Sequence, residues 1–389
     1  MKKKIAILGS TGSIGKTLLD IIDKDKDKFN ILLLTANKNY KSLLQQAKKF
    51  KVKNLIITDS KSYKILKTNT SGSKIKVFND FKKYKLVFKF KADYVMSAIT
   101  GIEALKPTID IVKYTKKIAI ANKESIICGW NLIKNEITKY KTEFVPIDSE
   151  HFSIWSLLNN KIDCSNIIEK IFITASGGPF YKYPLNKFSS ITPKLALNHP
   201  NWNMGKKISI DSSTLMNKVF EVIEAKNIFN LSYKQIYILT HQSSYLHAIV
   251  KFNNGIIKLL IHDTSMKIPI FNSIYKDIRK SIKSKDLQIE KLNNLNLQSV
   301  NQNRFPSIKI LKLLPKKHSL FETVILSSND ELVKLFLEGK IKFNEISDLI
   351  LKIAKMGEFI KYKKISPRNI DEIIKLSKFV RLKTNSLCI

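Results

Sequence analysis

Two acidic residues in the middle of the chain have the types and spacing of metal ligands. In the segment VPIDSEHFSIW, Asp148 and Glu150 lie two residues apart at the end of an apolar run. Residues i and i+2 of an extended chain point to the same side, so both carboxylates should face one way and favour a bound cation. Hard oxygen ligands suit Mg²⁺ or Mn²⁺ better than zinc. A solvated loop that contains two acids is the alternative, which the spacing leaves open.

A second polar segment, ISIDSSTLMNKVFEVIEA, places an amide, a cation and a carboxylate at helical spacing. Its hydroxyl-rich beginning predicts a helix start. The capping candidates are Asp211, Ser212, Ser213 and Thr214. Asn217, Lys218 and Glu221 should share one helix face, where they could hold a phosphate and complete a metal site. The alternative is an ordinary surface ion pair between Lys218 and Glu221, and we interpret Glu224 as a residue of that kind.

Near the first residue, the segment AILGSTGSIGKTLLDII places three glycines between an apolar run and an apolar helical pattern. Gly9, Gly12 and Gly15 allow a tight bend, and the first amides of the following helix favour an anion. Hydroxyls within reach of those amides are those of Ser10, Thr11 and Ser13. The dinucleotide fingerprint G-x-G-x-x-G has a first gap one residue shorter. The segment predicts a phosphate-binding turn, with a ligand-free glycine turn as the alternative.

The next apolar run, in FNILLLTANKNY, should end near the ribose of a bound dinucleotide. An acid at this place receives the ribose hydroxyls of NAD, whereas a basic residue accommodates the 2′-phosphate of NADP. Here Lys38 stands between Asn37 and Asn39, and the segment contains no acid. The segment favours NADPH, although a lysine is common anywhere in so lysine-rich a chain.

Two further loops have residues that could contact a ligand. The segment TASGGPF follows the apolar run KIFI and offers Ser176 beside Gly177 and Gly178, a backbone suited to an oxyanion. The segment NHPNWNMGKK contains His199 and Trp202, and we interpret it as a lid that excludes water from a site. Core packing of the tryptophan is the alternative.

The composition is that of a globular chain with an excess of lysine. Its formal net charge is +36, but only four of the 68 basic residues are arginine, and the lysines are scattered through every segment. Nucleic-acid readers favour arginine for bidentate contacts, so we interpret the charge as compositional drift and expect no nucleic-acid partner. No run of about 20 apolar residues predicts a membrane span. The glycine turn begins within ten residues of Met1, and the three cysteines lack metal-type spacing, so we expect no targeting segment and a cytoplasmic location.

Short apolar runs alternate with helical patterns in the first 150 residues. Six runs predict strands: KKIAIL, FNILLLTA, KNLIIT, ADYVMSAI, KKIAIANK and EFVPID. This alternation predicts an α/β fold with a Rossmann-like, doubly wound parallel sheet. Longer helices mixed with strands follow, and AIVKFNNGIIKLLI predicts an antiparallel hairpin through Asn253–Gly255, so we expect an α+β second domain.

The last third of the chain is predicted to be a connector followed by helices. Residues 275–305 are polar and lysine-rich, as expected for a connector. In NEISDLILKIAKMG, Asn344 is a predicted N-cap and Gly357 a predicted C-terminal stop. Apolar stripes in this segment and in NIDEIIKLSKFV predict the core of a C-terminal helical bundle.

Six segments together resemble one enzyme family. GSTGSIG, ANKES, PIDSEH, ASGGPF, HPNWNMGKKISIDSSTLMNK and EVIEA, in this order and spacing, are similar to 1-deoxy-D-xylulose 5-phosphate reductoisomerase. The resemblance is strong to about residue 270 and weak in the helical tail. It implies four parts: an NADPH-binding domain at residues 1–150, a catalytic and metal-binding domain with a lid at 151–275, a connector at 276–300 and a helical domain at 301–389. It also implies a homodimer.

The resemblance assigns residues to roles. The implied ligands of one Mg²⁺ or Mn²⁺ ion are Asp148, Glu150 and Glu221. The implied catalytic residues are Lys123, Asp148, Glu150, His199 and Glu221. The residues implied at the substrate phosphate are Ser176, Ser212, Asn217 and Lys218. Other implied substrate contacts are Ser149, Glu150, His199, Trp202 and Glu221. The residues implied to bind NADPH are Thr11, Gly12, Ser13, Ile14, Asn37, Lys38, Asn39, Asn122, Glu124 and Gly205.

The reaction that the resemblance implies has two steps. The metal stabilises negative charge while the carbon skeleton of the substrate rearranges to an aldehyde, and NADPH then reduces this aldehyde under a lid that carries Trp202. The product is 2-C-methyl-D-erythritol 4-phosphate, an isoprenoid precursor. The chain departs from the family pattern at residues 241–244 and 326–330, where it reads His-Gln-Ser-Ser and Leu-Ser-Ser-Asn-Asp, and at Asn198, where a basic residue is usual. These departures concern packing around the site and not the implied ligands.

Two other interpretations are open from the sequence. The chain could be an NADP-linked oxidoreductase of a sugar phosphate that does not rearrange the carbon skeleton. It could also be a basic nucleic-acid-binding protein on a degenerate dinucleotide-binding scaffold, an interpretation supported by net charge alone.

Overall fold

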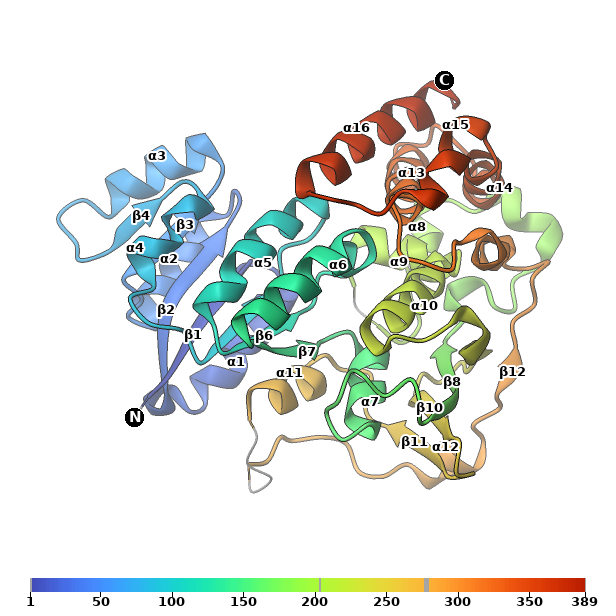
Figure 1. Cartoon of the computed structure of the whole chain (residues 1–389), viewed down its shortest axis with the longest axis horizontal. Helices are drawn as coiled ribbons and strands as arrows, with labels where there is room; N and C mark the ends of the chain where they lie inside the picture. Colours follow the sequence, from blue (N-terminus) through green and yellow to red (C-terminus); the bar gives the residue numbers. More distant parts are fainter. Residues whose placement is uncertain (1, 203, 276–279, 389) are drawn as a thin grey trace. The chain divides into compact units, whose positions relative to one another are not determined.

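The computed structural model describes residues 2–202, 204–275 and 280–388, and the chain forms two compact units (Figure 1). The first unit contains residues 1–125, 132–148 and 266–283, and the second contains residues 126–131, 149–265 and 284–389. Each unit has a sheet of its own. Within the described residues, no helix is long and apolar enough to cross a membrane.

The first unit is built on a parallel sheet of seven strands. Their bounds are β1 Lys3–Leu8, β2 Phe29–Ala36, β3 Asn54–Ile57, β4 Lys76–Phe78, β5 Tyr94–Ser97, β6 Lys117–Ile120 and β7 Glu143–Pro146. The strands lie in the order β4-β3-β2-β1-β5-β6-β7. The order reverses between β1 and β5, which is the place where doubly wound sheets bind ligands beyond the carboxyl ends of their strands. The predicted Rossmann-like sheet is confirmed.

Continuous apolar runs explain why the central strands are buried. The four residues from Ile5 to Leu8 are fully buried in β1, as expected for a strand covered on both faces. The sequence patterns missed β4, which has three residues and none of them fully buried. Such a short strand at the edge of a sheet has too few inward-facing residues to produce a readable pattern.

Helices cover this sheet and connect its strands. Their bounds are α1 Ser13–Asp23, α2 Tyr40–Lys49, α3 Ser60–Asn69, α4 Tyr84–Val87, α5 Leu105–Ile111 and α6 Lys123–Tyr140, with α11 Lys267–Ile274 contributed from far along the chain. Helix α11 packs against α1, and its Ser273 hydroxyl lies 2.7 Å from the Tyr94 hydroxyl in a buried hydrogen bond. Helix α6 is interrupted at Gly129, where the backbone is not helical.

The second unit contains a mixed sheet of five strands. Their bounds are β8 Ile168–Ala175, β9 Ile236–Thr240, β10 Leu246–Phe252, β11 Ile257–Ile261 and β12 Gln298–Ser299. The order is β11-β10-β8-β9-β12, with β8 and β9 parallel and the other neighbours antiparallel. The predicted hairpin through Asn253–Gly255 is confirmed, and Gly255 has the positive φ of 85° that its turn requires.

The helices of the second unit come before, between and after these strands. Their bounds are α7 Ser149–Leu157, α8 Pro193–Ala196, α9 Lys206–Ser213, α10 Met216–Phe229, α12 Ile289–Asn293, α13 Phe321–Leu337, α14 Phe343–Ala354, α15 Gly357–Ile360 and α16 Ile370–Ser386. Helix α13 packs against both α14 and α16, as Figure 1 shows near the C-terminus. This grouping confirms the predicted helical bundle. The expected connector contains only α12 and β12 as regular elements among its described residues, and residues 276–279 lie outside the description.

The predicted ends of α14 are wrong at both sides. The helix begins at Phe343, because the backbone N–H of Lys342 donates to the Glu345 carboxylate at 2.6 Å and so is satisfied without Asn344. Asn344 is therefore inside the helix. The helix ends at Ala354, and Gly357 begins α15.

The predicted helix start at residues 211–214 is also wrong. These residues form the end of α9, because the hydroxyls of Ser213 and Thr214 donate to the carbonyl oxygen of Ile210 at 2.8 and 3.1 Å. These hydroxyls therefore donate to a carbonyl oxygen inside α9 and do not accept from the first N–H groups of a following helix. Leu215 follows with a left-handed φ of 60°, and this residue turns the chain into α10.

Candidate active site

A buried cluster of two carboxylates and one ammonium group lies in the second unit. Nζ of Lys218 lies 2.7 Å from Oε1 of Glu150 and also contacts Oε2 of Glu221. The exposed fractions of the Lys218, Glu150 and Glu221 side chains are 4%, 14% and 1%. One oxygen of Glu150 and one of Glu221 lie within 4.8 Å of each other, and the amide of Asn217 donates to Glu221. The predicted shared face of Asn217, Lys218 and Glu221 is confirmed.

The cluster differs in two ways from the sequence-based expectations. Glu150 lies in the first turn of α7 and not in an extended strand, so the argument from alternating strand residues is wrong for it. Glu224, interpreted as a surface residue, is 1% exposed, and the pair of Lys218 and Glu221 is buried as well. Buried charges need close partners, which explains why these groups are gathered.

The two carboxylates control the charge of Lys218. Burial alone would lower its pKa, but the charges of Glu150 and Glu221 outweigh burial and hold the pKa well above its usual value. Lys218 is therefore a permanent cation. The cluster of Glu150, Glu221 and Lys218 carries one net negative charge, which suits a divalent cation with hard oxygen ligands.

Asp148 and Lys123 both belong to the first unit, and their side chains contact each other. Nζ of Lys123, the first residue of α6, lies 3.4 Å from Oδ2 of Asp148. Asp148 is bonded to Ser149, the first residue of α7, so it is two residues from Glu150 along the chain. The exposed fractions of the Lys123 and Asp148 side chains are 11% and 18%.

The sequence analysis did not single out His151, which contacts the acidic cluster. Its Nε2 lies 2.8 Å from the backbone carbonyl oxygen of Glu221, so this nitrogen is the donor. Its Nδ1 is 4.0 Å from Oε2 of Glu224. The ring therefore connects α7 with two consecutive turns of α10. Its place in the segment PIDSEH, next to Glu150, was an available signal, but neighbours along a helix point in different directions.

A second polar group brings together His199, Ser176 and Ser212. Nε2 of His199 lies 3.1 Å from both serine hydroxyls, and the backbone N–H of Gly178 donates to Ser176 at 3.1 Å. Gly178 has a φ of 62°, and a Cβ there would lie 2.9 Å from Cα of Ser213. Glycine is therefore required where this loop meets the end of α9. The contacts join Ser176 and Ser212, which the resemblance places at the substrate phosphate, to His199, which it places at the hydroxyl and carbonyl end of the substrate.

The ring of His199 also organises the candidate lid. Its Nδ1 accepts hydrogen bonds from the backbone N–H groups of Asn201 and Trp202, each at 3.1 Å. Nδ1 is thus the unprotonated nitrogen, and Nε2 carries the hydrogen that faces the two serines. Burial lowers the pKa of His199 to about 4, so the ring is neutral near pH 7. Asn203, also in this loop, lies outside the described residues.

The segment that departs from the family pattern at residues 241–244 contacts the lid. The amide nitrogen of Asn201 donates to the carbonyl oxygen of Gln242 at 2.5 Å and lies 3.1 Å from the Ser244 hydroxyl. Trp202 is half-buried, and its ring meets the edge of the His247 ring at 6.3 Å. The lid therefore contacts this segment through the backbone of Gln242 and through Ser244, a serine that the family pattern also has.

His247 is a further residue that the sequence did not reveal. Its ring stacks on that of His262 at 3.7 Å, and burial lowers the pKa of His247 to about 3. Both rings are nearly fully buried. His247 is the second residue of β10, and the sequence carries no signal for its stacking on His262, because the neighbours of a strand residue are set by tertiary packing.

The glycine turn of the first unit has the shape of an anion-binding loop. Gly9 has a φ of 80°, and a Cβ there would lie 2.6 Å from the carbonyl oxygen of Ala98. A Cβ on Gly15 would lie 2.5 Å from the carbonyl oxygen of Gly9. Helix α1 begins after Gly12 with no side-chain cap, so the hydroxyls offered for capping do not cap it and its first amides point to the loop. The Ser10 hydroxyl instead contacts Gln46 at 2.8 Å.

The other residues expected at the cofactor lie at helix starts of the first unit. Asn39 caps α2 by accepting from the N–H of Ser42 at 3.1 Å, and Lys38 beside it is exposed. Asn37 donates to the Thr58 hydroxyl at 2.8 Å. Asn122 caps α6 and donates to Glu124 at 2.7 Å, so these two buried side chains are held together. In the second unit, Gly205 precedes α9 and is exposed.

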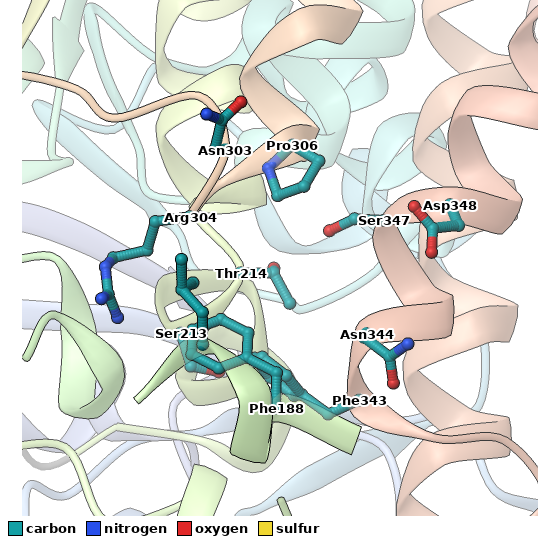
Figure 2. Close-up of a pocket in the computed structure, with 11 residues that line it drawn as sticks. Phe188, Ser213, Thr214, Asn303, Arg304, Pro306, Phe343, Asn344, Ser347 and Asp348 are labelled. Atoms are coloured by element: carbon teal, nitrogen blue, oxygen red, sulfur yellow. The ribbon is translucent and has the colours of Figure 1, made fainter. Parts of the chain in front are cut away.

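A cavity of about 230 Å³ lies beside α9 and outside this group of residues. Figure 2 shows Ser213 and Thr214 on one side of it and Asn344, Ser347 and Asp348 of α14 on the other. Arg304, which also lines it, donates to the carbonyl oxygens of Phe180 and Tyr183 at 2.7 and 2.6 Å. The cavity contains none of the predicted ligand residues, and its arginine is engaged in holding a loop.

These features are those of a dinucleotide-dependent oxidoreductase that uses a hard metal ion, because the chain contains both a doubly wound sheet with a glycine turn and a buried carboxylate cluster. Family descriptions match residues 5–129, as 1-deoxy-D-xylulose 5-phosphate reductoisomerase, and residues 144–229 and 262–383, as its C-terminal domains. The chain is 61% identical to the enzyme of that name from Pelagibacter ubique over 389 residues, which is all of both chains. It belongs to the 1-deoxy-D-xylulose 5-phosphate reductoisomerase family.

More distant relatives agree with this assignment. The reductoisomerase of Wolbachia pipientis wMel is 36% identical over 90% of this chain and 89% of its own. The reductoisomerase of Zymomonas mobilis, solved in complex with NADPH, is 29% identical with a TM-score of 0.87 over 100% of this chain and 99% of its own. A reductoisomerase in complex with NADPH, fosmidomycin and magnesium is 26% identical with a TM-score of 0.88 over 99% and 98%.

Family membership also decides between the interpretations that the sequence left open. The chain is an NADP-dependent, divalent-metal-dependent reductoisomerase that converts 1-deoxy-D-xylulose 5-phosphate to 2-C-methyl-D-erythritol 4-phosphate for isoprenoid precursors. The interpretations as a reductase without rearrangement and as a nucleic-acid-binding protein are not supported.

Proposed function

We propose that the family reaction runs in this chain with Asp148, Glu150 and Glu221 as ligands of one Mg²⁺ or Mn²⁺ ion. The observation that carries this assignment is the buried cluster in which Glu150 and Glu221 approach each other around Lys218. Carboxylate oxygens are the donors that these ions prefer, and the cluster's charge fits a dication. Asp148 is added from its position two residues before Glu150 and from the family resemblance.

Lys218 and Asn217 have a second role in this proposal. Both now contact the carboxylates of the cluster. A dication held by the carboxylates would repel the Lys218 ammonium, which would then be available to the substrate phosphate. Metal binding and phosphate binding should therefore support each other.

The phosphate itself is proposed to bind at Ser176 and Ser212 with His199. The Nε2–H of His199 already points at both hydroxyls, so it can donate to a phosphate oxygen without changing its tautomer. The two hydroxyls and the imidazole N–H would bind the phosphate as neutral donors, and the Lys218 ammonium, once released from the carboxylates, would add a charged donor. Binding energy from this remote group would orient the reacting end of the substrate.

NADPH is proposed to bind in the first unit, and the shape of its glycine turn supports this. The turn leaves no room for a Cβ at Gly9 or Gly15, and α1 presents uncapped amides to a pyrophosphate. Proposed contacts there are Thr11, Gly12, Ser13 and Ile14. Lys38, between Asn37 and Asn39, would accept the 2′-phosphate. Asn122, Glu124 and Gly205 are the remaining proposed contacts.

In this reaction the side chains of the protein bind the substrate and exclude water from it. When bound, a divalent cation supplies Lewis-acid polarisation of substrate oxygens and NADPH supplies a hydride. Ser149, next to Asp148 in the chain, and Lys123, whose Nζ lies 3.4 Å from Oδ2 of Asp148, would bind the hydroxyl and carbonyl end of the substrate. Trp202 and its loop would exclude water, with His199 holding the loop by two backbone hydrogen bonds.

The first experiment follows NADPH oxidation by absorbance with 1-deoxy-D-xylulose 5-phosphate, with Mg²⁺ and then with a chelator. We expect oxidation that needs the metal and a branched polyol phosphate as the product. A simple alcohol as the product would contradict the rearrangement. Oxidation that survives exhaustive chelation would contradict the metal ligands proposed here.

We further propose that the chain forms a homodimer through the open face of its second sheet. Leu259, Ile249, Phe172 and Tyr237 are cross-strand partners in consecutive strands, so they form one apolar row on a single face. The exposed fractions of Leu259 and Tyr237 are 45% and 40%. A self-complementary row of this kind suits an interface with a second copy of the chain.

We also propose a role for each part of the chain and a location for the protein in the cell. Residues 1–150 would bind NADPH, residues 151–275 would carry the catalytic and metal-binding groups with the lid, residues 276–300 would connect, and residues 301–389 would form the supporting helical domain. We propose a cytoplasmic location, because the reaction consumes NADPH, an intracellular reductant.

A further inference from the structure

Helix α9 carries one of the proposed phosphate contacts and is too short to be stable by itself. It has eight residues, Lys206–Ser213, and Ser212 lies in its last turn. Isolated helices shorter than about 12–15 residues are marginal in water, so side-chain contacts must fix the position of α9. The contacts that do so determine where the Ser212 hydroxyl lies.

The inner contact is made by the residue that precedes Ser212. Asp211 is 1% exposed, and its Oδ1 accepts a hydrogen bond from the amide of Asn329, on α13, at 2.7 Å. Its Oδ2 accepts from Nζ of Lys207, one turn earlier on α9, at 2.8 Å. Asn329 is fully buried. Both carboxylate oxygens of Asp211 are thus held by the protein, where water cannot replace the partners.

The outer contact extends this arrangement to the last helix of the chain. Nζ of Lys207 also lies 3.0 Å from Oδ1 of Asp330, and Arg381 of α16 donates to Oδ2 of Asp330 at 2.5 Å. The Lys207 ammonium lies over the Phe220 ring at 5.3 Å. We name the five residues Lys207, Asp211, Asn329, Asp330 and Arg381 the α9 network.

The α9 network alternates in charge from α16 to α9. Arg381 and Lys207 each stand beside Asp330, and Lys207 also stands beside Asp211. Removing one member of a mostly buried ion pair leaves its partner without compensation, so the remaining groups must move. The loss of Arg381 would release Asp330, which would draw Lys207 away from Asp211.

The choice of arginine at position 381 supports a requirement for geometry. Lysine supplies nearly all the positive charge of this chain, and arginine occurs at four positions. Arginine offers several donors in a fixed plane, whereas a lysine ammonium is a mobile point charge. If position 381 needed only a positive charge, a lysine would supply it, as lysines do at most other basic positions of the chain.

We propose that the α9 network positions the Ser212 hydroxyl and so sets the affinity of the enzyme for the phosphate group of its substrate. The inference rests on the proposed phosphate role of Ser212. Arg381 is a positioning residue that acts through Asp330 and Lys207. Asn329, which matches the family's Asn-Ala-Ala-Asn-Glu segment, and Asp330, which stands where that segment has Glu, thereby gain a function beyond packing.

The test is the substitution Arg381→Met in the full-length enzyme. Its side chain is 32% exposed, so a substitution of similar length should fold. We expect the KM for 1-deoxy-D-xylulose 5-phosphate to rise about five- to twentyfold, the range of a coupling between contacting residues. The KM for NADPH should stay unchanged, and kcat should change less than the substrate KM. Inorganic phosphate, used as a competitor, should bind correspondingly more weakly.

The matched control is Arg368→Met. Arg368 lies just before the same helix and pairs with Glu372 at 3.2 Å, but its side chain is 81% exposed. This variant should match the parent in both KM values. Arg381→Lys keeps the charge and should recover part of the substrate affinity, and it serves as the readout if Arg381→Met does not fold.

Ser212→Ala separates this inference from the assignment on which it rests. If Ser212 holds the phosphate, its alanine variant raises the substrate KM, and adding Arg381→Met should raise it little further. If Ser212→Ala leaves the KM unchanged, the phosphate role of Ser212 is wrong. If Ser212→Ala raises the KM while both Arg381 variants lower only thermal stability, the phosphate role stands and the positioning role is overturned.

Discussion

Glu221 holds three neighbours in one place. Its carboxylate accepts hydrogen bonds from Asn217 and Lys218, and its backbone carbonyl oxygen lies 2.8 Å from Nε2 of His151. The side chain is 1% exposed, so water cannot substitute for these partners. One residue therefore connects the proposed metal centre to both α7 and the start of α10.

The first prediction concerns the charge of this residue. Glu221→Gln removes a proposed metal ligand while keeping the shape of the side chain, so turnover should fall at least about 100-fold. Isothermal titration with Mg²⁺ should show weaker binding, whereas NADPH affinity should stay close to that of the parent. Glu169→Gln is the matched control, since Glu169 is a surface carboxylate that pairs with Lys251. Full turnover in Glu221→Gln would remove Glu221 from the ligand set.

The second prediction concerns the protonation of His199. Burial lowers its pKa to about 4, and Nδ1 accepts two backbone hydrogen bonds. The folded state therefore binds a proton less readily than the unfolded state, so this group reduces stability as the pH falls from about 6.5 towards 4. Imidazole ¹⁵N NMR of the substrate-free enzyme should show a neutral Nε2–H ring from pH 6 to 8. The signal can be assigned with His199→Asn. A midpoint near 6.5 or an Nδ1–H ring would contradict the hydrogen-bond assignment.

At the scale of elements, the first helix and strand depend on the absence of side chains at two glycines. A Cβ on Gly15 would lie only 2.5 Å from the carbonyl oxygen of Gly9, which is closer than real Cβ contacts. Gly12 is different, because the nearest atom to its Cβ position is 3.4 Å away. The turn therefore requires glycine at Gly9 and Gly15 but has room for a Cβ at Gly12.

This difference gives the third prediction. Gly15→Ala should destabilise the ligand-free protein by about 1–3 kcal/mol, the usual cost of overpacking. Gly12→Ala should cost less than about 1 kcal/mol, since it only changes the residue at the N-cap. Thermal unfolding without NADPH measures both. Equal melting temperatures for the two variants would mean that the turn relaxes without strain.

The elements that could be predicted from sequence are those whose own residues determine them. Six strands of the first sheet are continuous apolar runs, and the hairpin at Asn253–Gly255 has its turn residues in the sequence. Likewise, the shared face of Asn217, Lys218 and Glu221 follows from helical spacing alone. These predictions needed no knowledge of distant contacts.

The elements that could not be predicted are set by distant contacts. Helix α9 ends at Ser213 because Leu215 adopts a left-handed conformation that a leucine rarely takes by itself. Asp211, expected to be a cap, instead bonds to Asn329, more than a hundred residues away. The local geometry of Glu150 was predicted wrongly, because α7 begins at Ser149 and the extended chain does not reach Glu150. Its role as a metal ligand stays a prediction.

At the scale of the whole molecule, lysine and arginine have separate uses. Lysines give the chain most of its net charge of +36, and many of those described are exposed. Arg304 and Arg381 instead make close contacts, Arg304 with two backbone carbonyl oxygens and Arg381 with Asp330. These two arginines therefore serve a structural contact each, whereas most of the lysines supply charge at the surface.

The fourth prediction concerns assembly. If the apolar row on β9, β8, β10 and β11 is a dimer interface, Leu259→Asp should convert the protein from twice the 44.7 kDa mass of one chain to a monomer. Lys258→Asp, on the neighbouring position and the opposite face, is the control and should leave the dimer intact. Light scattering at several concentrations measures both. A parent protein that is already monomeric at micromolar concentration would exclude the homodimer.

Leu215 also determines where this chain can tolerate a change in length. Ser212 lies before this left-handed corner, and Lys218 and Glu221 lie after it. One residue inserted at the corner would rotate α10 by about 100° around its axis, which would carry both side chains away from Glu150. The hairpin at residues 253–255 has no such linkage, so it can accept insertions. Variation in length among related sequences should therefore be frequent at the hairpin and absent from the corner.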